Sequence, residues 1–170
     1  SLCVSDMAPM TDDGALLLHN SLRRAAAAAC IAKATGAQSQ EYFTGGLLLE
    51  LGFLMRSSEA LTTVADIARS PAAGRLAHER ATFGSAHPEH GAAGAKEFGL
   101  GDRLSAAIAA HHDQTPPGDP FANALWAAER VAAVFEGGDI GALQREAHAA
   151  LAEVGVAGDA AQQLLRDLPE

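Results

Sequence analysis

The sequence predicts an all-α fold, a compact bundle of several helices, and three observations support this prediction. Alanine, which has the highest helix propensity, accounts for 39 of the 170 residues, and only eight residues are aromatic. β-Branched residues are sparse outside short runs, as is typical of helical domains. Helix caps and helix-ending glycines recur along the chain with no internal repeat or linker between them. We therefore expect one domain over residues 1–170, with its core at about 12–137 and a C-terminal helical extension at about 138–170.

Capping residues set the boundaries of the expected helices. Thr11-Asp12-Asp13 can cap the first helix, and Ser70-Pro71 and His87-Pro88 each place a proline in the first turn after a possible cap. Glycines that follow the apolar pattern end several of the helices. The expected ranges are 11–35, 39–56, 60–68, 70–81, 87–98, 102–112, 119–136 and two helices within 139–168 that separate near 155–158.

The helix expected at 39–56 is nearly apolar on all sides, which is typical of a helix buried in the middle of a bundle. Glu50 lies on its apolar stripe, three residues after Leu47. Because an unpaired buried charge is costly, Glu50 must be paired, protonated or directed into a cavity. The stripe consists of Phe43, Leu47, Leu51 and Leu54, and Leu48 and Leu49 widen it.

Other polar residues are also expected on inward faces. His19 precedes Leu22 at i+3, and Leu22 and Leu18 belong to the apolar face expected for the first helix. His111 follows Ile108 at i+3 and so points inward, whereas His112 is rotated by about 100° and need not share its environment. The candidates for an internal polar site are His19, Glu50, His87, His111, His112 and Glu129.

Charge and motifs exclude several classes of function. The chain has 21 acidic and 12 basic residues, a net charge of −9, and its basic residues are scattered, which argues against nucleic-acid binding. No apolar run approaches the ~20 residues of a membrane span and no signal peptide is visible, so we expect a cytoplasmic protein without membrane contact. No glycine-rich phosphate loop or GxSxG motif is present. His78-Glu79 is expected on a solvated helix face.

The order of these motifs resembles the HD superfamily and, within it, the HDOD group, the HD-related output domains of bacterial signalling proteins. The resemblance covers about residues 15 to 135. The motifs that carry it are His19, the Gly-Leu-Leu-Leu-Glu-Leu-Gly stretch at 46–52, Glu79 with Phe83-Gly84, His87-Pro-Glu-His-Gly-Ala at 87–92, and Ile108-Ala-Ala-His-His at 108–112.

The resemblance implies a degenerate metal site. In catalytic HD enzymes a first His, a His-Asp pair, later histidines and a final Asp hold one or two metals. Here Leu49-Glu50 falls on the His-Asp pair, and a leucine cannot ligate a metal. Loss of this ligand is expected to cripple the geometry that metal-assisted phosphoester cleavage needs. Of the other positions, His19 matches the first His, His87 the following one, His111 or His112 the next, and Glu129 approximately the last Asp.

We therefore expect a non-catalytic bacterial output or adaptor domain that needs no cofactor. It would act through contacts with a protein partner or with a second copy as a homodimer. One alternative is a metal-dependent HD-type phosphohydrolase of nucleotide or cyclic-nucleotide phosphodiesters, with a divalent metal in a reorganised site. Another is a nucleotide-binding sensor without turnover. For the histidines, hydrogen-bonded side chains are favoured over a degenerate metal site, and a histidine rather than a metal is expected to hold Glu50.

Overall fold

The computed structural model describes residues 11–70 and 74–168, and within these ranges the chain is helical with no strand. The all-α prediction is confirmed. Among the described helices, none combines the length and the hydropathy that a membrane crossing requires. In chain order the helices are α1 (Asp12–Ala34), α2 (Ser39–Leu48), α3 (Leu51–Arg69), α4 (Arg75–Phe83), α5 (His87–Glu97), α6 (Asp102–Ala110), α7 (Pro120–Ala133), α8 (Ile140–Glu153) and α9 (Asp159–Asp167).

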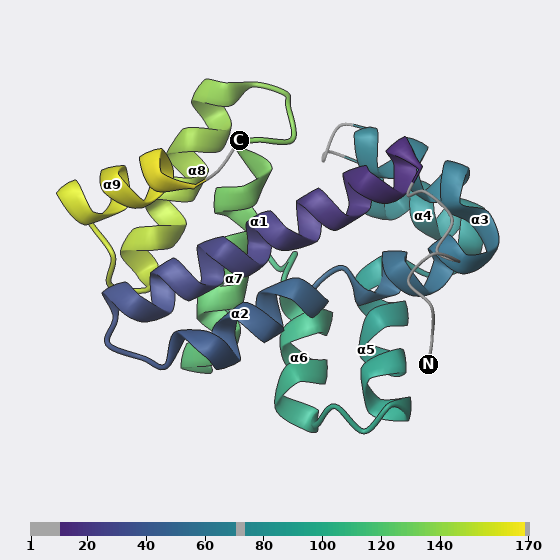
Figure 1. Ribbon diagram of the computed structural model, residues 1–170, viewed down its shortest axis with the longest axis horizontal. Coiled ribbons are helices and arrows are strands. Elements are labelled where there is room, and N and C mark those ends of the chain that lie inside the picture. The colour runs from purple at the N-terminus through teal and green to yellow at the C-terminus, as the bar shows by residue number, and fades with distance from the viewer. Residues whose placement is uncertain (1–10, 71–73, 169–170) are drawn as a thin grey trace, which may run out of the picture.

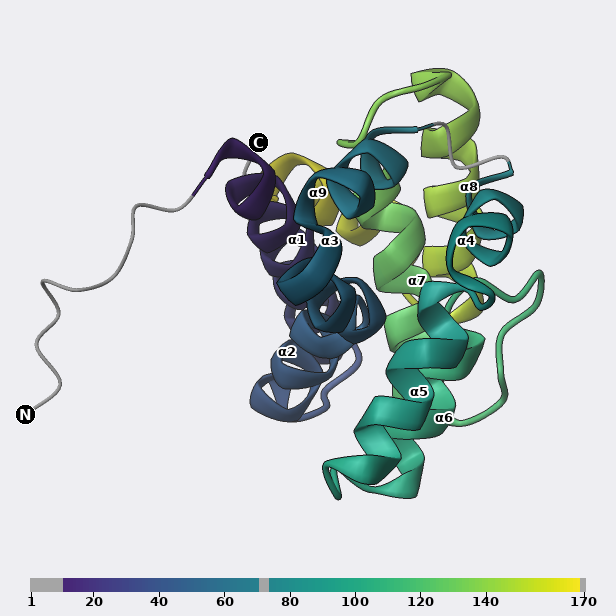
Figure 2. The same ribbon diagram turned by 90° about the vertical axis from the view of Figure 1, so that its right-hand side faces the viewer.

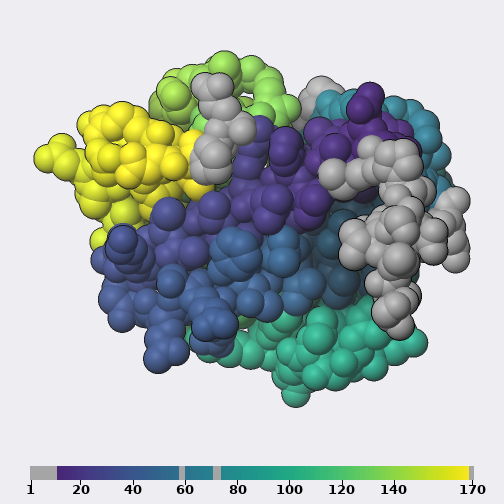
Figure 3. Space-filling view, viewed as in Figure 1, coloured from purple at the N-terminus to yellow at the C-terminus, as the bar shows by residue number. Residues whose placement is uncertain are grey.

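Helices α1 and α7 form the centre of the bundle. The long helix α1 crosses the molecule diagonally and packs against α2, α3 and α7, while α5 and α6 lie side by side below it (Figure 1). A view from the side shows α7 between α1 and the pair α5–α6 (Figure 2). On the surface, α1 and α2 together form much of one face (Figure 3). Helix α7 is buried on nearly all sides, and the side chains of Leu125, Ala127, Ala128 and Val131 are fully buried.

Local capping signals were reliable for three helices. The Thr11 hydroxyl accepts a hydrogen bond from the Gly14 backbone N–H at 3.2 Å and caps α1. Asp119 caps α7 by accepting from two backbone N–H groups, and Asp139 caps α8 in the same manner. The tail divides at residues 155–158 as predicted. These helix starts depend on residues close in sequence, which is why the sequence alone identifies them.

The single helix predicted at 39–56 is wrong, because the chain turns at Leu49 and Glu50 between α2 and α3. The predicted start of a separate helix near residue 60 is confirmed, because α3 is two helices joined at a kink at Ala60, whose φ of −144° and ψ of 45° are non-helical. Two glycines account for the turn. A Cβ on Gly46 would overlap the backbone of α1, and a Cβ on Gly52 would overlap the backbone of α5. Because the chain turns between these two glycines, Gly46 can pack against α1 while Gly52 packs against α5.

Further boundaries and one helix face differ from the prediction. Helix α4 begins after Gly74, whose φ is 88°, and not at Ser70; Pro71 lies outside the described residues. Helix α7 ends at Ala133, before the glycines at 137–138. On α1, Leu18 and Leu22 are each 40% exposed, because the helix is rotated relative to the predicted face. The buried face of α1 consists of Leu17, Asn20, Ser21, Arg24, Ala25, Ala27, Ala28, Ile31 and Ala32.

Candidate functional site

Glu50 lies in the turn between α2 and α3, and its side chain points into the molecule with only 6% of the residue exposed. Its Oε1 atom is 3.2 Å from Nε of Arg24, 3.6 Å from Nε2 of His87 and 3.7 Å from Nε2 of His111. The nearest cation is therefore an arginine of α1. Among the described residues, none donates a hydrogen bond with good geometry to Oε1.

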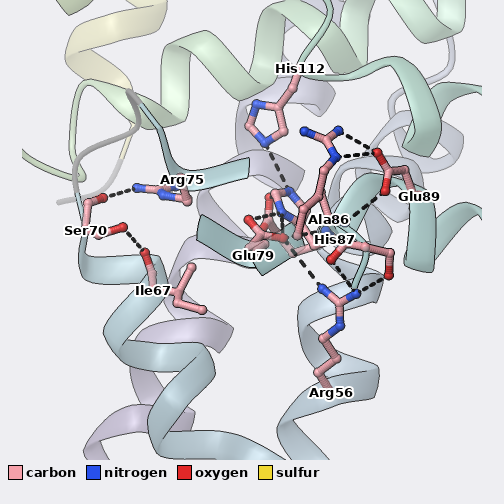
Figure 4. A network of polar contacts seen from close by, with 12 residues as sticks. Arg56, Ile67, Ser70, Arg75, Glu79, Ala86, His87, Glu89 and His112 are labelled. Carbon is pink, nitrogen blue, oxygen red and sulfur yellow. Dashed lines mark hydrogen bonds and ion pairs between the residues drawn. The ribbon is translucent and has the colours of Figure 1, made fainter. Parts of the chain in front are cut away.

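His87 begins α5 and is fully buried. Its Nδ1 atom lies 2.9 and 3.0 Å from the two carboxylate oxygens of Glu79, and the same carboxylate accepts the His87 backbone N–H. A carboxylate acceptor places the proton of the ring on Nδ1. In the neutral ring, Nε2 therefore carries a lone pair that faces the interior of the site. Figure 4 shows Glu79 and His87 in contact, with Arg56 next to Glu79 and His112 directed at the His87 ring.

Glu79 was predicted on a solvated helix face, and this prediction is wrong, although its neighbour His78 is exposed. Glu79 is fully buried because α4 turns it towards α5. A sequence signal was present, since Glu79 shares a face with Leu76 at i−3 and Phe83 at i+4. A carboxylate between two apolar residues on a short helix indicates burial with a partner.

His111 and His112 follow the end of α6 and both reach the site. His111 Nδ1 lies 2.6 Å from the carbonyl oxygen of Ile108, so Nδ1 carries the proton and Nε2 faces the interior, 3.2 Å from His87 Nε2. His112 places its own Nε2 3.0 Å from His87 Nε2 and its Nδ1 3.8 Å from Oε1 of Glu129. The helix ends at Ala110, and this end is what brings two consecutive side chains to one point.

Four potential metal ligands thus converge at one point. One atom from each of Glu50, His87, His111 and His112 lies within 4.8 Å of the others. The first three residues are buried, and the His112 side chain is 22% exposed. We refer to these four residues as the histidine cluster.

Arg24 joins the carboxylates on the other side of Glu50. The guanidinium is 1% exposed and contacts the carboxylate of Glu129 through Nε and Nη2, the latter at 3.2 Å. Its Nη1 lies 2.7 Å from Glu136, and the second oxygen of Glu136 lies 3.3 Å from Nη1 of Arg75. Arg24 was not among the residues predicted from the sequence. The signal was its place on the face of Leu17 and Ile31, which lie seven residues to either side.

Burial and these contacts shift the pKa values of the charged residues. Burial alone would lower the pKa of Arg24, but Glu129, Glu136 and Glu50 together raise it well above its usual value. Burial alone would raise the pKa of Glu129, but Arg24 lowers it to about 2. Arg24 likewise overcomes the effect of burial on Glu50, whose pKa lies well below the usual range. Burial, with the charge of His111, lowers the pKa of His112 well below its usual value, so His112 is neutral at pH 7.

The predicted site residues divide into two groups. The structure brings together Glu50, His87, His111, His112 and Glu129. His19 was predicted to join them, but it is exposed on α1 and lies outside the cluster, because α1 is rotated so that Asn20 and Arg24 face inward. The sequence gave no warning of this rotation, since the alanine-rich helix has weak amphipathicity.

Comparisons with known proteins agree on the fold. The model of the HDOD domain family matches residues 2–114. The match ends before α7, so Glu129 lies outside it. A search of curated proteins found no match.

The solved structures similar to the chain include a response regulator and a protein described as a phosphohydrolase. The response regulator MmoQ from Methylococcus capsulatus strain Bath has a TM-score of 0.71 and 22% identity over 90% of this chain. A protein described as a phosphohydrolase, from Shewanella amazonensis SB2B, has a TM-score of 0.64 and 23% identity over 94% of this chain. The chain spans 62% of the length of each of these structures. At this level of identity the likeness concerns the fold.

Proposed function

Because the chain belongs to the HDOD domain family, we propose that it is a non-catalytic signal-transduction domain of bacterial type that acts through protein–protein contacts. The observation that carries this proposal is the pair of contacts made by Arg24. Its guanidinium contacts both Glu50 and Glu129, the two residues that fall on the acidic positions of catalytic HD enzymes. A fixed guanidinium that neutralises both carboxylates removes them from the ligand set that two metals would need.

Burial of the site gives independent support. A catalytic metal needs an open coordination position and a route for its substrate. Glu50 is 6% exposed, and His87 and His111 are fully buried. Leu49, which falls on the position of a metal-binding His, is also fully buried and packs in the main hydrophobic core. Of the four cluster residues, His112 alone has an appreciably exposed side chain, at 22%, so a phosphodiester would have little access to the others.

The surface offers apolar side chains to a partner. On α1, Leu18 and Leu22 are both 40% exposed at i,i+4 spacing. At the turn between α5 and α6, Phe98 is 59% exposed and Leu100 39%. Leu100 also lines a pocket with Leu104 and Phe121. Exposed large apolar groups of this kind are enriched at protein interfaces.

The test of the non-catalytic function is a phosphodiesterase assay. The protein is incubated with Mn²⁺, Fe²⁺ or Zn²⁺ and with bis-p-nitrophenyl phosphate, cyclic nucleotides and dinucleotides. We expect no turnover above that of His87→Ala. Metal-dependent turnover that His87→Ala abolishes would overturn the proposal.

The contact function is tested through self-association. Sedimentation velocity over a dilution series measures whether the chain forms dimers, and Leu18→Glu/Leu22→Glu is compared with a matched change at the exposed His148, His148→Glu. If α1 forms the dimer interface, the double variant sediments as a monomer and the control does not. A monomer at all concentrations excludes the homodimer and leaves a different protein as the partner.

One observation favours a second candidate, a metal-dependent phosphohydrolase of the HD type. Three imidazoles and a carboxylate converge in the histidine cluster, as in a metal site. The phosphodiesterase assay decides between the two functions, because only the second predicts turnover.

A further inference from the structure

The outer face of α1 carries a straight stripe of apolar side chains. Leu18 and Leu22 on this face are each 40% exposed, and neither belongs to the two hydrophobic clusters of the described residues. Positions eleven residues apart on an α-helix lie almost on one line along its axis. Positions 15, 18 and 22 recur at this spacing at 26, 29 and 33. The α1 stripe consists of Ala15, Leu18, Leu22, Ala26 and Ala29, and Lys33 ends it.

The two ends of the α1 stripe carry opposite charges. Asp12 lies in the first turn of α1 and Lys33 in the last turn, and both residues are exposed, whereas the neighbouring Asp13 is paired with Arg69. Residues 14–34 include no acidic residue, although the chain as a whole has a net charge of −9. Two copies of an acidic chain repel each other over most of their surfaces. The α1 stripe is therefore a face on which a second copy would meet little of this repulsion.

The two arginines of α1 are turned away from the stripe. Arg24 is buried and paired with Glu129. Arg23 is half-buried, is rotated by about 100° from Leu22, and places its guanidinium 5.9 Å from the centre of the Phe135 ring. The middle of the stripe is consequently apolar, and its charges are confined to the two ends.

An antiparallel pair of α1 helices would match large side chains with small ones. With a two-fold axis beside Leu22, Leu22 packs against the partner's Leu22. Leu18 then lies opposite the partner's Ala26, and Ala15 lies opposite the partner's Ala29. Each leucine at position 18 thus meets an alanine, which fills the space between the helices evenly and allows their backbones to approach closely.

The same pairing would place opposite charges together at both ends. Lys33 lies next to the partner's Asp12, and the two-fold axis repeats this contact at the other end. The two helix macrodipoles also run in opposite directions. A parallel pair would instead place Asp12 beside the partner's Asp12 and Lys33 beside the partner's Lys33, with leucine against leucine and alanine against alanine. Charge and volume therefore both favour the antiparallel arrangement.

We propose that the α1 stripe is a homodimer interface, in which α1 packs antiparallel against α1 of a second copy about a two-fold axis beside Leu22. A surface that complements itself in charge and in side-chain volume is what a two-fold interface requires, whereas a different partner requires no such self-complementarity. The inference rests on the proposed contact function and deepens it, because it names the partner and its orientation.

Disulfide cross-linking tests the orientation. The native cysteines are replaced by Cys3→Ser/Cys30→Ser, and Ala15→Cys or Ala29→Cys is added to separate samples. We expect a covalent dimer when the two samples are mixed and oxidised and none from either sample alone, because a disulfide requires Cα atoms about 4.4–6.8 Å apart. Covalent dimers from either sample alone would show a parallel pair and overturn the inference.

Charge reversal tests the contacts at the two ends. Asp12→Lys and Lys33→Glu each place like charges together at both ends of the dimer, so each should raise the dimer Kd in sedimentation velocity about 10-fold. An equimolar mixture of the two variants restores both opposite-charge contacts and should return to the wild-type Kd, which mixing could not do for a folding defect. The matched control Lys96→Glu changes an exposed lysine in the last turn of α5 and should leave the Kd unchanged. A wild-type Kd in both α1 variants would contradict the interface.

The outcomes separate this inference from the proposed function. A monomer at all concentrations overturns the homodimer and leaves the contact function with a different protein as partner. A dimer that Phe98→Glu abolishes and Leu18→Glu/Leu22→Glu does not would lie at the turn between α5 and α6, and this result also overturns the inference. Metal-dependent turnover in the phosphodiesterase assay overturns the non-catalytic function and leaves the dimer interface intact.

Discussion

Arg24→Met tests how much the buried charge network contributes to stability. Methionine retains most of the volume of the side chain and removes its guanidinium. The guanidinium contacts three carboxylates, each with a side chain no more than 7% exposed. Removing one partner of a buried ion pair costs about 3–5 kcal/mol, because a buried charge is left uncompensated. In a domain of this size 1 kcal/mol changes Tm by about 2–4 °C, so we expect Tm to fall by about 10 °C.

The dependence on pH separates a charge effect from a packing effect. In the wild type, the pKa of Glu129 is lowered to about 2 from a usual value of 4.5. A lowered carboxylate pKa adds stability above the unfolded-state pKa, and this stability is lost as pH falls through the folded-state value. Without Arg24, burial raises the carboxylate pKa instead. The stability deficit of Arg24→Met should therefore be largest near pH 8 and shrink towards pH 5.

The assay is urea unfolding followed by circular dichroism, at both pH values. The neighbouring Arg23 provides a matched control, because Arg23→Met makes the same change on the same helix at a residue that is only half-buried. The control loses a cation–π contact with Phe135 at 5.9 Å and should lose no more than about 1 kcal/mol. A loss of stability in Arg24→Met no larger than that in Arg23→Met, or an equal loss at pH 8 and pH 5, would contradict a contribution from the buried charges.

Three further predictions concern the surroundings of the cluster. Glu79→Ala leaves the Nδ1–H of the buried His87 without its acceptor and should lower the free energy of unfolding by about 3 kcal/mol in urea titrations; a loss below 1 kcal/mol contradicts the pairing. Gly52→Ala should lower Tm strongly, since the added Cβ would overlap the backbone of α5. The control Gly141→Ala adds a Cβ with ordinary contacts and should leave Tm unchanged or raise it. Similar changes of Tm in the two variants would contradict the close approach of Gly52 to α5. In acid titrations, Glu129→Gln should remove part of the stability that the wild type loses between about pH 4.5 and 2, and an unchanged profile would argue against the lowered pKa.

The sequence predicted those elements whose signals are local. Thr11 caps α1 as predicted, and Asp119 and Asp139 cap α7 and α8 at the predicted starts of these helices, in each case through neighbouring residues. The turn at Glu50 has no capping signal, because residues 47–51 all have good helix propensity, and the glycines at 45, 46 and 52 are the local sign of a break. The turn depends on the approach of Gly46 to α1 and of Gly52 to α5, contacts that a single sequence does not reveal.

The residues of the site were likewise predicted where the signal is local in the sequence and missed where it is not. Glu50 and His111 were found because each interrupts or ends an apolar stripe, and His87 was found because it matches a His of the HD motifs. Arg24 was missed because its main partner, Glu129, is 105 residues away in the sequence. His19 was misplaced because α1 buries small alanines, and an alanine-rich helix does not define which of its faces is inward.

The energetics of the network explain how its polar residues can be retained in the interior of the protein. Each charged group in it is compensated by others on different helices: Arg24 on α1 contacts Glu129 on α7, and Glu79 on α4 contacts His87 on α5. Replacing one member by an apolar residue leaves its partner charged and buried, at a cost of several kcal/mol. Only simultaneous replacement of partners avoids this cost. Stability is thus a sufficient reason for the network, and the presence of these histidines and carboxylates is not by itself an argument for catalysis.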